Sequence, residues 1–576
     1  MIGTTLNRGS KAGDSKVLSP AFFLGLSLLA HGTFFPQEWL LLGAGLAFLL
    51  SWQSWKSSRI NGLRVSEENG ILSITDVLLF TLVGLSLLGL WHPVKSSEGW
   101  MDAVRWGTLW MIYHQARKIP NGLEQEKMLS WIERFGVLLA VLAWLKLFNS
   151  WFQGQGFFSA GTERLSSLFG YPNALGVYLA AVLLLRPRSK ITQALLLLTL
   201  LNTGSRAAVF CFLMVWGVQV LIRRRRAGGA FSSLRKGVLG AVIIISCLCL
   251  TWVLNPGTFQ RLLNWGIENS LGERILYLLD GLKLSWSNRG LPRAGGWFAF
   301  PLVQTIPYWT SDPHSIWIRV LLNQGIFGVS ALLFWMILIL KKIRGGYKHR
   351  PKDISLLSQE DGDKRLEIFS ALFFLGWHAM IDADFLFGSL GILFWILWGM
   401  FLPKQLKKDF HLSKLKNILA GLCFLVLALI LLRAWVYPQW LDPQKSIEQE
   451  MVKAEGDKQQ SLEILKKSLD QDQTQEKVRQ EIANLELELY GAGGLKAAEQ
   501  VLAWEKFDIH TYEWLQGRAI EEAEKCRGTD PKDALILYRW SASLPSRLEA
   551  ASLRPSELMK LLKGTAEEGQ LNLPDP

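Results

Sequence analysis

The sequence predicts an all-α protein that combines a polytopic membrane domain of about 12–13 transmembrane helices with a C-terminal soluble helical domain. Three observations lead to this fold class. Half of the 576 residues are hydrophobic, and up to about residue 437 they form apolar runs long enough to cross about 30 Å of hydrocarbon. Lys and Arg cluster in alternate connections between these runs. Beyond residue 441 the chain is polar, with apolar residues at helical spacing.

The predicted domain boundaries follow composition and charge. Residues 1–17 form a cytoplasmic N-terminal segment, residues 18–440 the transmembrane domain and residues 441–576 an extracytoplasmic helical domain. The net charge of +13 divides into −8 for residues 441–576 and +21 for the remainder. Because the basic residues lie in short connections between spans, membrane topology explains them better than a nucleic-acid partner does.

The apolar runs define the expected spans in order. They lie at residues 18–35, 37–54, 71–91, 100–116, 131–150, 168–185, 190–203, 206–222, 236–254, 316–340, 366–383, 385–402 and 415–437. The 190–203 span is short, and the 100–116 span contains Asp102 and Arg105. The first span is expected to be retained, because Leu28 occupies the −3 position of a would-be signal-peptide cleavage site after Ala30, where a small residue is needed.

The basic clusters predict the orientation. They occupy the connections with Lys56, Arg59 and Arg64; Arg117 and Lys118; Arg186, Arg188 and Lys190; Arg223 to Arg226 with Arg235 and Lys236; Lys341, Lys342 and Arg344; and Lys404, Lys407 and Lys408. Short loops rich in Lys and Arg mark the cytoplasmic side. We therefore expect a multi-pass protein of the cytoplasmic membrane, with a cytoplasmic N-terminus and with the tail and the 255–315 connection outside.

The long connection at residues 255–315 is the candidate functional region. Arg274 lies at the start of an amphipathic segment, residues 301–309 are rich in aromatic side chains suited to a membrane interface, and His314 directly precedes the next span. A histidine at such a position is often a cap or a solvated residue. Beside arginines on the same face it becomes a candidate base, because its pKa lies near the working pH.

Two further arginines are expected on the outer face. Arg164 precedes the 168–185 span, and Arg206 follows the tight 202–206 turn. The interpretations without a functional role are a solvated side chain for Arg164 and a snorkelling side chain for Arg206. The alternative is that both bind a lipid-linked phosphate, because bidentate guanidinium groups suit phosphate oxygens.

Other polar features carry less information. His378, Asp382 and Asp384 lie near the outer end of a span, where the carboxylates either pair with loop arginines or end the helices. The tail is typical of stacked helices, with breaks at 491–494, Gly528 and Pro531, and either a tetratricopeptide-like array or an irregular bundle fits it. The five cysteines show no metal or disulfide spacing, and no cofactor is predicted.

Taken together, these motifs resemble the bacterial O-antigen ligase and O-antigen polymerase family of polytopic glycosyltransferases. The resemblance covers about residues 70–400. It is carried by Arg164, Gly170-Tyr171-Pro172-Asn173, Gly204-Ser205-Arg206, Arg274, Gly295-Gly296-Trp297, His314 and Asn323-Gln324-Gly325-Ile326-Phe327-Gly328. Two positions depart from the family: Ser315 stands where Asn usually follows the histidine, and Gln324 where an acidic residue is common.

The resemblance implies transfer or polymerisation of a glycan from an undecaprenyl-diphosphate donor onto a hydroxyl of a saccharide or lipid-linked acceptor, outside the cytoplasmic membrane and without metal. Arg206, Arg274 and Arg164 would bind the diphosphate, and His314 would activate the acceptor; Arg274 and His314 would be catalytic. Displacement by the acceptor would invert the anomeric centre.

Two rival functions use the same features. A transporter or flippase of lipid-linked saccharides would bind the diphosphate with the same arginines and perform no chemistry; it would favour broken helices at the membrane midplane and internal repeats. A scaffold would use the membrane part only as an anchor. The stacked tail helices would offer a concave surface to a protein partner under any of these functions.

Overall fold

The computed structural model describes residues 9–59, 73–120, 122–152, 164–226, 245–263, 270–348, 359–402, 414–437 and 457–552. Over these ranges the protein is helical and contains no strand, which confirms the predicted all-α class. Part of the predicted basic connections lies outside the described residues, namely Arg64, Arg235, Lys236, Lys404, Lys407 and Lys408.

The first part of the chain contains α1 (Gly9–Leu29), α2 (Pro36–Arg59), α3 (Ile74–Leu88), η1 (Gly89–Trp91), α4 (Ser96–Ala116), α5 (Leu123–Phe152), η3 (Ser167–Phe169), α6 (Pro172–Leu184), α7 (Lys190–Asn202) and α8 (Arg206–Arg226). A helix described over Ile245–Leu254 follows. Then come α10 (Pro256–Leu263), α11 (Ser270–Ser287), η4 (Gly296–Leu302), α12 (Ile316–Asn323), α13 (Gly325–Lys348), α14 (Gln359–His378), η5 (Asp384–Leu386), α15 (Gly388–Phe401) and α16 (Lys414–Val436). The tail consists of α18 (Lys458–Gln471), α19 (Glu476–Tyr490), η7 (Gly491–Gly494), α20 (Leu495–Trp504), α21 (Ile509–Cys526) and α22 (Pro531–Ser552).

Four of the described helices are long and apolar enough to cross a membrane. They cover Ile74–Trp91, Leu123–Asn149, Arg206–Arg226 and Lys416–Val436. Six shorter apolar helices accompany them, among them α6, α7 and α15. Large apolar side chains such as Phe48 on α2, Phe334 on α13 and Ile430 on α16 are exposed on the outside of the bundle. Such a surface is expected of helices that face lipid.

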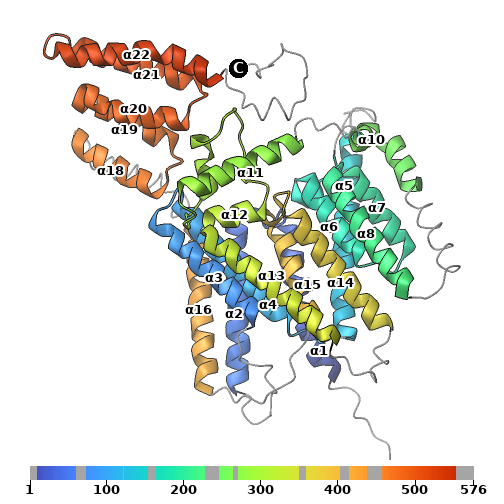
Figure 1. Cartoon of the computed structure of the whole chain (residues 1–576). Helices are drawn as coiled ribbons and strands as arrows, with labels where there is room; N and C mark the ends of the chain where they lie inside the picture. Colours follow the sequence, from blue (N-terminus) through green and yellow to red (C-terminus); the bar gives the residue numbers. More distant parts are fainter. Residues whose placement is uncertain are drawn as a thin grey trace, which may run out of the picture.

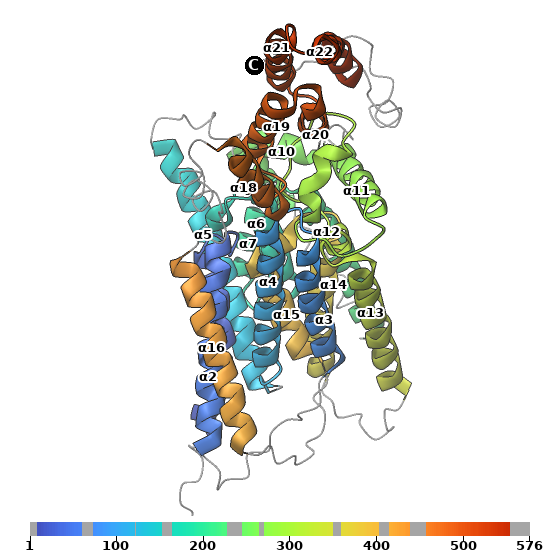
Figure 2. The ribbon, with the colours of Figure 1, turned by 90° about the vertical axis from the view of Figure 1, so that its left-hand side faces the viewer.

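The bundle has two distinct ends (Figure 1). The tail helices α18–α22 stack beside one end, which we call the tail-side end, together with α11 and α12 (Figures 1 and 2). At the opposite end, Arg223 pairs with Glu367 at 2.7 Å, and Arg188 pairs with Glu126 at 2.8 Å. These arginines come from connections that the charge pattern assigns to one common side. The helices α2 and α16 run side by side towards that end (Figure 2).

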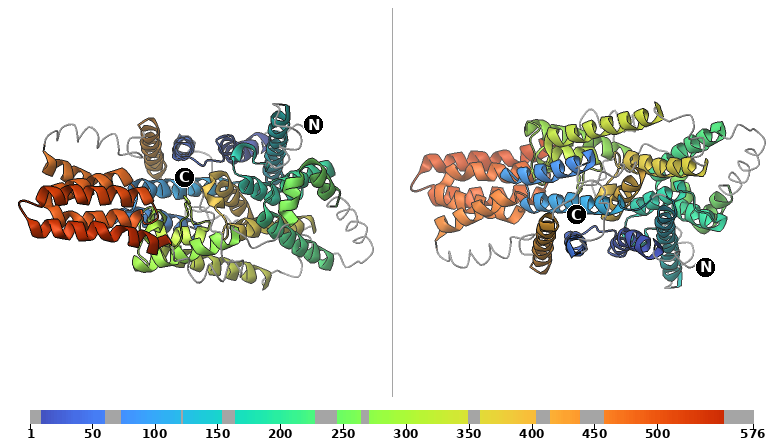
Figure 3. Two further views of the ribbon diagram at one scale, coloured as in Figure 1. Left: turned by 90° about the horizontal axis from the view of Figure 1, so that it is seen from above. Right: turned by 90° about the horizontal axis from the view of Figure 1, so that it is seen from below.

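Seen along the bundle axis, the tail projects beyond the other helices of the bundle (Figure 3). Its predicted helical segments and breaks are confirmed: α19 ends at the glycine-rich turn 491–494, α21 ends at Cys526, and α22 begins at Pro531. Antiparallel neighbours such as α21 and α22 pack along their lengths. Leu515 of α21 and Leu544 of α22 belong to the same buried cluster.

The predicted single span at 316–340 is wrong. Two helices, α12 and α13, occupy it, and the helical conformation is interrupted at Gln324. Gly325 has φ of +71°, which L side chains rarely adopt, and a Cβ there would lie 2.6 Å from the carbonyl oxygen of Gly290. The amide of Ile326 donates instead to that carbonyl at 2.8 Å. Close packing against the long connection therefore ends α12 where hydropathy alone predicts continuity.

A buried carboxylate next to this break ties three helices together. Asp102, on α4, accepts hydrogen bonds from Arg105 at 2.8 Å, from Arg319 of α12 at 3.2 Å and from Asn323 at 2.6 Å. The side-chain amide nitrogen of Gln324 also donates a hydrogen bond to the hydroxyl of Ser86 on α3 at 2.8 Å. The charges in the predicted 100–116 span are therefore paired inside the bundle, where an isolated charge would be costly.

Replacing Asp102 with Ala should destabilise the fold strongly. The change leaves Arg105 and Arg319 buried without this carboxylate, and breaking a buried pair in this way costs about 3–5 kcal/mol. A lowered midpoint of thermal unfolding in detergent would measure the effect. The matched control is Asp363→Ala, which removes long ion pairs near the opposite end, such as the 3.9 Å contact with Arg226. Equal unfolding midpoints for the two variants would contradict the structural role of Asp102.

Candidate functional site

The carboxylate of Asp382 forms the centre of a polar cluster at the tail-side end. Asp382 lies in the connection after α14, and its side chain is fully buried. Four side chains from three separate segments donate to it: Arg274 at 2.7 Å, Asn173 at 2.9 Å, His314 at 3.1 Å and Tyr171 at 3.2 Å. A buried carboxylate with this many donors is well satisfied. It also fixes the positions of its partners relative to one another.

His314 is held in an unusual backbone conformation. Its φ is +53°, and its amide donates to Oδ1 of Asp312 at 2.8 Å. The imidazole stacks on Tyr277 of α11, with ring centroids 5.5 Å apart and an interplanar angle of 23°. Since a carboxylate accepts, Nδ1–H donates to Asp382, and in the neutral ring Nε2 then carries the lone pair. Backbone strain of this kind is common at functional sites.

The surroundings of His314 favour its protonated form. Burial by itself would lower the pKa of His314, but the hydrogen bond and the charge of Asp382 outweigh it, so the pKa lies above its ordinary value of 6.5. Folding therefore gains stability from protonated His314 below the ordinary pKa, and this contribution is lost as the pH rises through the raised pKa.

Arg164 joins the cluster through the amide of Asn173. Its Nη2 donates to Oδ1 of Asn173 at 2.6 Å, and its Nε donates to the carbonyl of Thr203 at 2.8 Å. Gly204, with φ of +60°, forms the turn before α8, and a Cβ there would lie 3.3 Å from Nε of Arg164. The tight turn predicted at 202–206 is therefore confirmed, and it lies directly against Arg164.

Two further arginines lie close enough to affect Arg164. Burial and the nearby charges of Arg261, on α10, and of Arg206, the first residue of α8, together lower the pKa of Arg164 to about 10 against the opposing effects of Tyr171 and Asp382. Arg164 remains charged at neutral pH. Positive charges that crowd together in this way are stabilised by an anion, and guanidinium groups suit phosphate oxygens.

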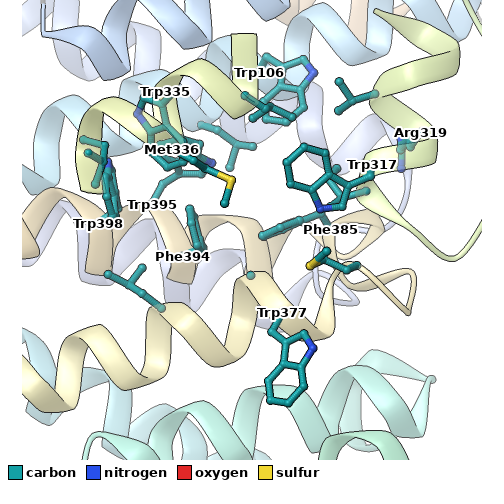
Figure 4. A pocket seen from close by; sticks show the side chains of 18 of the residues that line it. Trp106, Trp317, Arg319, Trp335, Met336, Trp377, Phe385, Phe394, Trp395 and Trp398 are labelled. Atoms are coloured by element: carbon teal, nitrogen blue, oxygen red, sulfur yellow. The ribbon is translucent and has the colours of Figure 1, made fainter. Parts of the chain in front are cut away.

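A large apolar cavity lies within the helix bundle (Figure 4). It has a volume of about 490 Å³ and is bounded by α4, α12, α13, α14 and α15. Aromatic side chains such as Trp335, Trp377 and Phe394 line it (Figure 4). Part of its wall, including Met336 and Phe373, is exposed at the side of the bundle. The cavity suits a flexible apolar chain that enters from the side.

The cavity and the polar cluster share structural elements. The amide of Ile316, a cavity residue, donates to the carbonyl of Ala379 at 2.9 Å, which joins the segments that carry His314 and Asp382. Arg319 lines the cavity and binds Asp312 at 3.3 Å, and Asp312 in turn accepts the amide of His314. A ligand in the cavity that contacts Arg319 would therefore be linked through Asp312 to the backbone of His314.

The other acidic and histidine residues near the end of α14 take a different arrangement. Asp384 accepts a hydrogen bond from Nδ1 of His378 at 2.7 Å, and both side chains are buried. Of the two outcomes that the sequence left open for the carboxylates, pairing with a loop arginine therefore holds for Asp382. Asp384 pairs with histidine and begins η5.

The structure brings Arg164, Arg274 and His314 together around Asp382, and Arg206 lies close enough to Arg164 to affect its pKa. Tyr277 and Arg261 were not singled out from the sequence, because their importance depends on neighbours far away in the chain. Among the described residues, no group of three or more His, Cys, Asp or Glu side chains has a metal-binding arrangement. Comparison with protein-family models, with curated proteins and with solved structures finds no match to this chain.

Replacing Asp382 with Asn should lower the pKa of His314. The substitution keeps the size of the side chain but removes the charge, so burial, already the largest influence on the imidazole pKa, loses its main opposing influence. Titration of the histidine signals by NMR in micelles, assigned with His314→Gln, would measure this pKa. Glu38→Gln is the matched control, because Glu38 pairs with a different histidine, His31, at 2.9 Å. An unchanged His314 titration in Asp382→Asn would refute the coupling.

Proposed function

We propose that the protein is a membrane glycosyltransferase that transfers or polymerises a glycan from an undecaprenyl-diphosphate-linked donor onto an acceptor hydroxyl. The observation that carries the proposal is the cluster of Arg274, His314 and Asp382, with Arg164 attached through Asn173. It combines positive charge for a leaving group with a carboxylate-oriented histidine. The motifs that resemble the O-antigen ligase and polymerase family supply Arg164, Asn173, Arg274 and His314 of this cluster.

The arginines would bind the donor diphosphate. Arg164, Arg206 and Arg274 come from three separate connections, and Arg261 adds a fourth positive charge nearby. When the bond between the anomeric carbon and the diphosphate oxygen breaks, its electron pair stays on the diphosphate. Fixed guanidinium groups stabilise this developing charge more than they stabilise the bound donor, and that difference accelerates the reaction.

His314 would accept the acceptor proton. With Nδ1 donating to Asp382, Nε2 takes the proton of the attacking hydroxyl as the new glycosidic bond forms, and Asp382 stabilises the imidazolium. A single displacement of this kind inverts the anomeric centre. Because diphosphate is a good leaving group, one base is sufficient and no second carboxylic acid is needed.

The apolar cavity supports a lipid-linked donor. Its volume of about 490 Å³ is within the range of small-molecule sites, and its lining suits part of an isoprenoid chain. Trp317 and Met380 lie in its wall, within three residues of His314 and Asp382 in the sequence. A chain in the cavity would leave the diphosphate near the arginines.

The membrane arrangement is part of the proposal. We propose about 12–13 transmembrane helices in the cytoplasmic membrane, a cytoplasmic N-terminus, and a tail-side end that faces outwards with the tetratricopeptide-like domain. This orientation is supported by the arginine pairs Arg223–Glu367 and Arg188–Glu126 at the end opposite the site. Lipid-linked donors, unlike nucleotide sugars, are available on that outer face.

A transporter or flippase of lipid-linked saccharides is the alternative function. It would bind the same diphosphate at the same arginines and the lipid chain in the same cavity. The hydrogen bond between His314 and Asp382 favours the enzyme, because transport needs no oriented base. The two functions differ in product: only the enzyme forms a new glycosidic bond.

Changing Arg274 or His314 to Ala should abolish glycan transfer while leaving the protein in the membrane. Loss of one charge-stabilising donor or of the general base reduces such rates at least about a hundredfold. The purified variants would be incubated with synthetic undecaprenyl-diphosphate oligosaccharides and acceptor, and the glycosidic product measured by mass spectrometry.

The matched control is Arg289→Asn, since Arg289 is an exposed arginine of the same connection and Asn tolerates its φ of +54°. It should retain wild-type turnover. Undiminished transfer in both Ala variants would contradict the proposed roles of Arg274 and His314 in glycan transfer. Movement of the donor lipid across liposomes without any glycosidic product would establish the transporter instead.

A further inference from the structure

The C-terminal helical domain contacts the long connection at two places. The first is Gln473, at the end of α18. Its amide donates to the carbonyl of Val94 at 2.6 Å, and its side chain donates to the carbonyl of Pro93 at 3.0 Å and accepts from Arg293 at 3.1 Å. One residue of the tail thereby joins the entry to α4 and the segment before η4.

The second contact lies at the end of α20. Nζ of Lys506 donates to the carbonyl of Gln304 at 2.8 Å. Trp504 packs against the aromatic cluster of the long connection, which contains Tyr277, Trp297 and Phe300. This second contact therefore combines a charged hydrogen bond with apolar packing, and it lies on the cluster that supports the site.

The aromatic cluster leads from the tail to the imidazole. Tyr308, which packs on the same cluster as Trp504, lies 5.0 Å from Tyr277 between ring centroids, and Tyr277 stacks on His314 at 5.5 Å. The hydroxyl of Tyr308 also donates to Asp280 of α11 at 2.8 Å. The tail thus packs against one side of the aromatic cluster. This cluster orients both α11, which carries Arg274, and the ring of His314.

Both contacts depend on one buried arginine. Arg479 of α19 is 4% exposed. Its Nη1 donates to the carbonyl of Gln473, its Nη2 donates to Glu505 at 2.9 Å, and its guanidinium lies 4.4 Å from the ring centroid of Trp504. Only a planar, permanently charged side chain can satisfy all three partners together.

We propose that the C-terminal helical domain is a structural wall of the candidate site, and that Arg479 is the positioning residue that holds Gln473, Trp504 and Lys506 against the long connection. The inference goes beyond the proposed function in assigning a role to the tail, and its kinetic part rests on that function. The tail touches no reacting atom; it acts through Tyr277 and α11.

The test uses the full-length protein in micelles and two variants. Arg479→Ala removes the arginine that holds both contacts in place. The double variant Gln473→Ala with Lys506→Ala removes the hydrogen bonds that these two side chains make outside the tail and leaves the tail core intact. Hydrogen exchange followed by mass spectrometry should show faster exchange in peptides covering residues 93–101 and 296–310. Peptides from α21 and α22 should stay protected in the double variant.

Turnover supplies the second readout. With the synthetic lipid-linked donor, kcat should fall about ten- to a hundredfold, because misplacing a catalytic group by about 1 Å has effects of this size. The KM for donor should change less than about twofold in the double variant, since Arg164 and Arg206 lie outside the aromatic cluster. The control is Arg547→Ala, which breaks the ion pair with Glu499 inside the tail and should alter neither readout.

Unchanged exchange at residues 93–101 and 296–310 in both variants would overturn the attachment. Faster exchange with wild-type kcat would overturn the positioning role. Because hydrogen exchange reports the attachment whether or not the protein transfers glycan, failure of the proposed function and failure of this inference are distinguishable.

Discussion

The arrangement of the site depends on the hydrogen bonds that the buried carboxylate of Asp382 accepts. Without it, the N-terminus of α6, the start of α11 and the segment before α12 would have no common partner. Removing one member of a buried ion pair costs about 3–5 kcal/mol, far more than an exposed ion pair contributes. Each donor also occupies a position that its own segment could not maintain alone: His314 has a left-handed backbone, and Asn173 bridges Arg164 to the carboxylate. The site is therefore a tertiary structure, assembled only when the bundle is complete.

Asp102, on α4, plays a similar role in the helix bundle. It joins α4 to α12 as Asp382 joins the connections at the tail-side end, and Asp312 links the two carboxylates through Arg319 and the amide of His314. Polar networks of this kind specify one packing of helices whose apolar faces are otherwise interchangeable. The same constraint explains why α12 is only one short helix. Its last residues turn towards Asp102 and Ser86, and Gly325 then lets the chain pass close to the backbone of Gly290.

Much of the fold follows from local sequence, and much of the site does not. Apolar length and the cap-and-break signals around Pro172, Arg206 and Pro531 give helix starts that agree with the structure. The break at Gln324 could not be predicted, because it is set by Asp102 and Gly290 rather than by nearby residues. Arg164, Arg274 and His314 could be selected from their chemistry and their expected common face. Their shared partner could not be chosen between Asp382 and Asp384, because which carboxylate points at α11 depends on the turn after α14.

The aromatic cavity has a practical consequence for work with the purified protein. Its walls are made of tryptophan, phenylalanine and methionine side chains that adapt to chains of many shapes, and part of the wall reaches the surface of the bundle. The alkyl tail of a solubilising detergent has the chemistry to fill the same space. Solubilisation in detergent would then place a competitor for the proposed lipid ligand beside the cavity at high concentration. Reconstitution into native lipid is thus a condition for measuring affinity at this cavity, and the length of the detergent chain becomes an experimental variable.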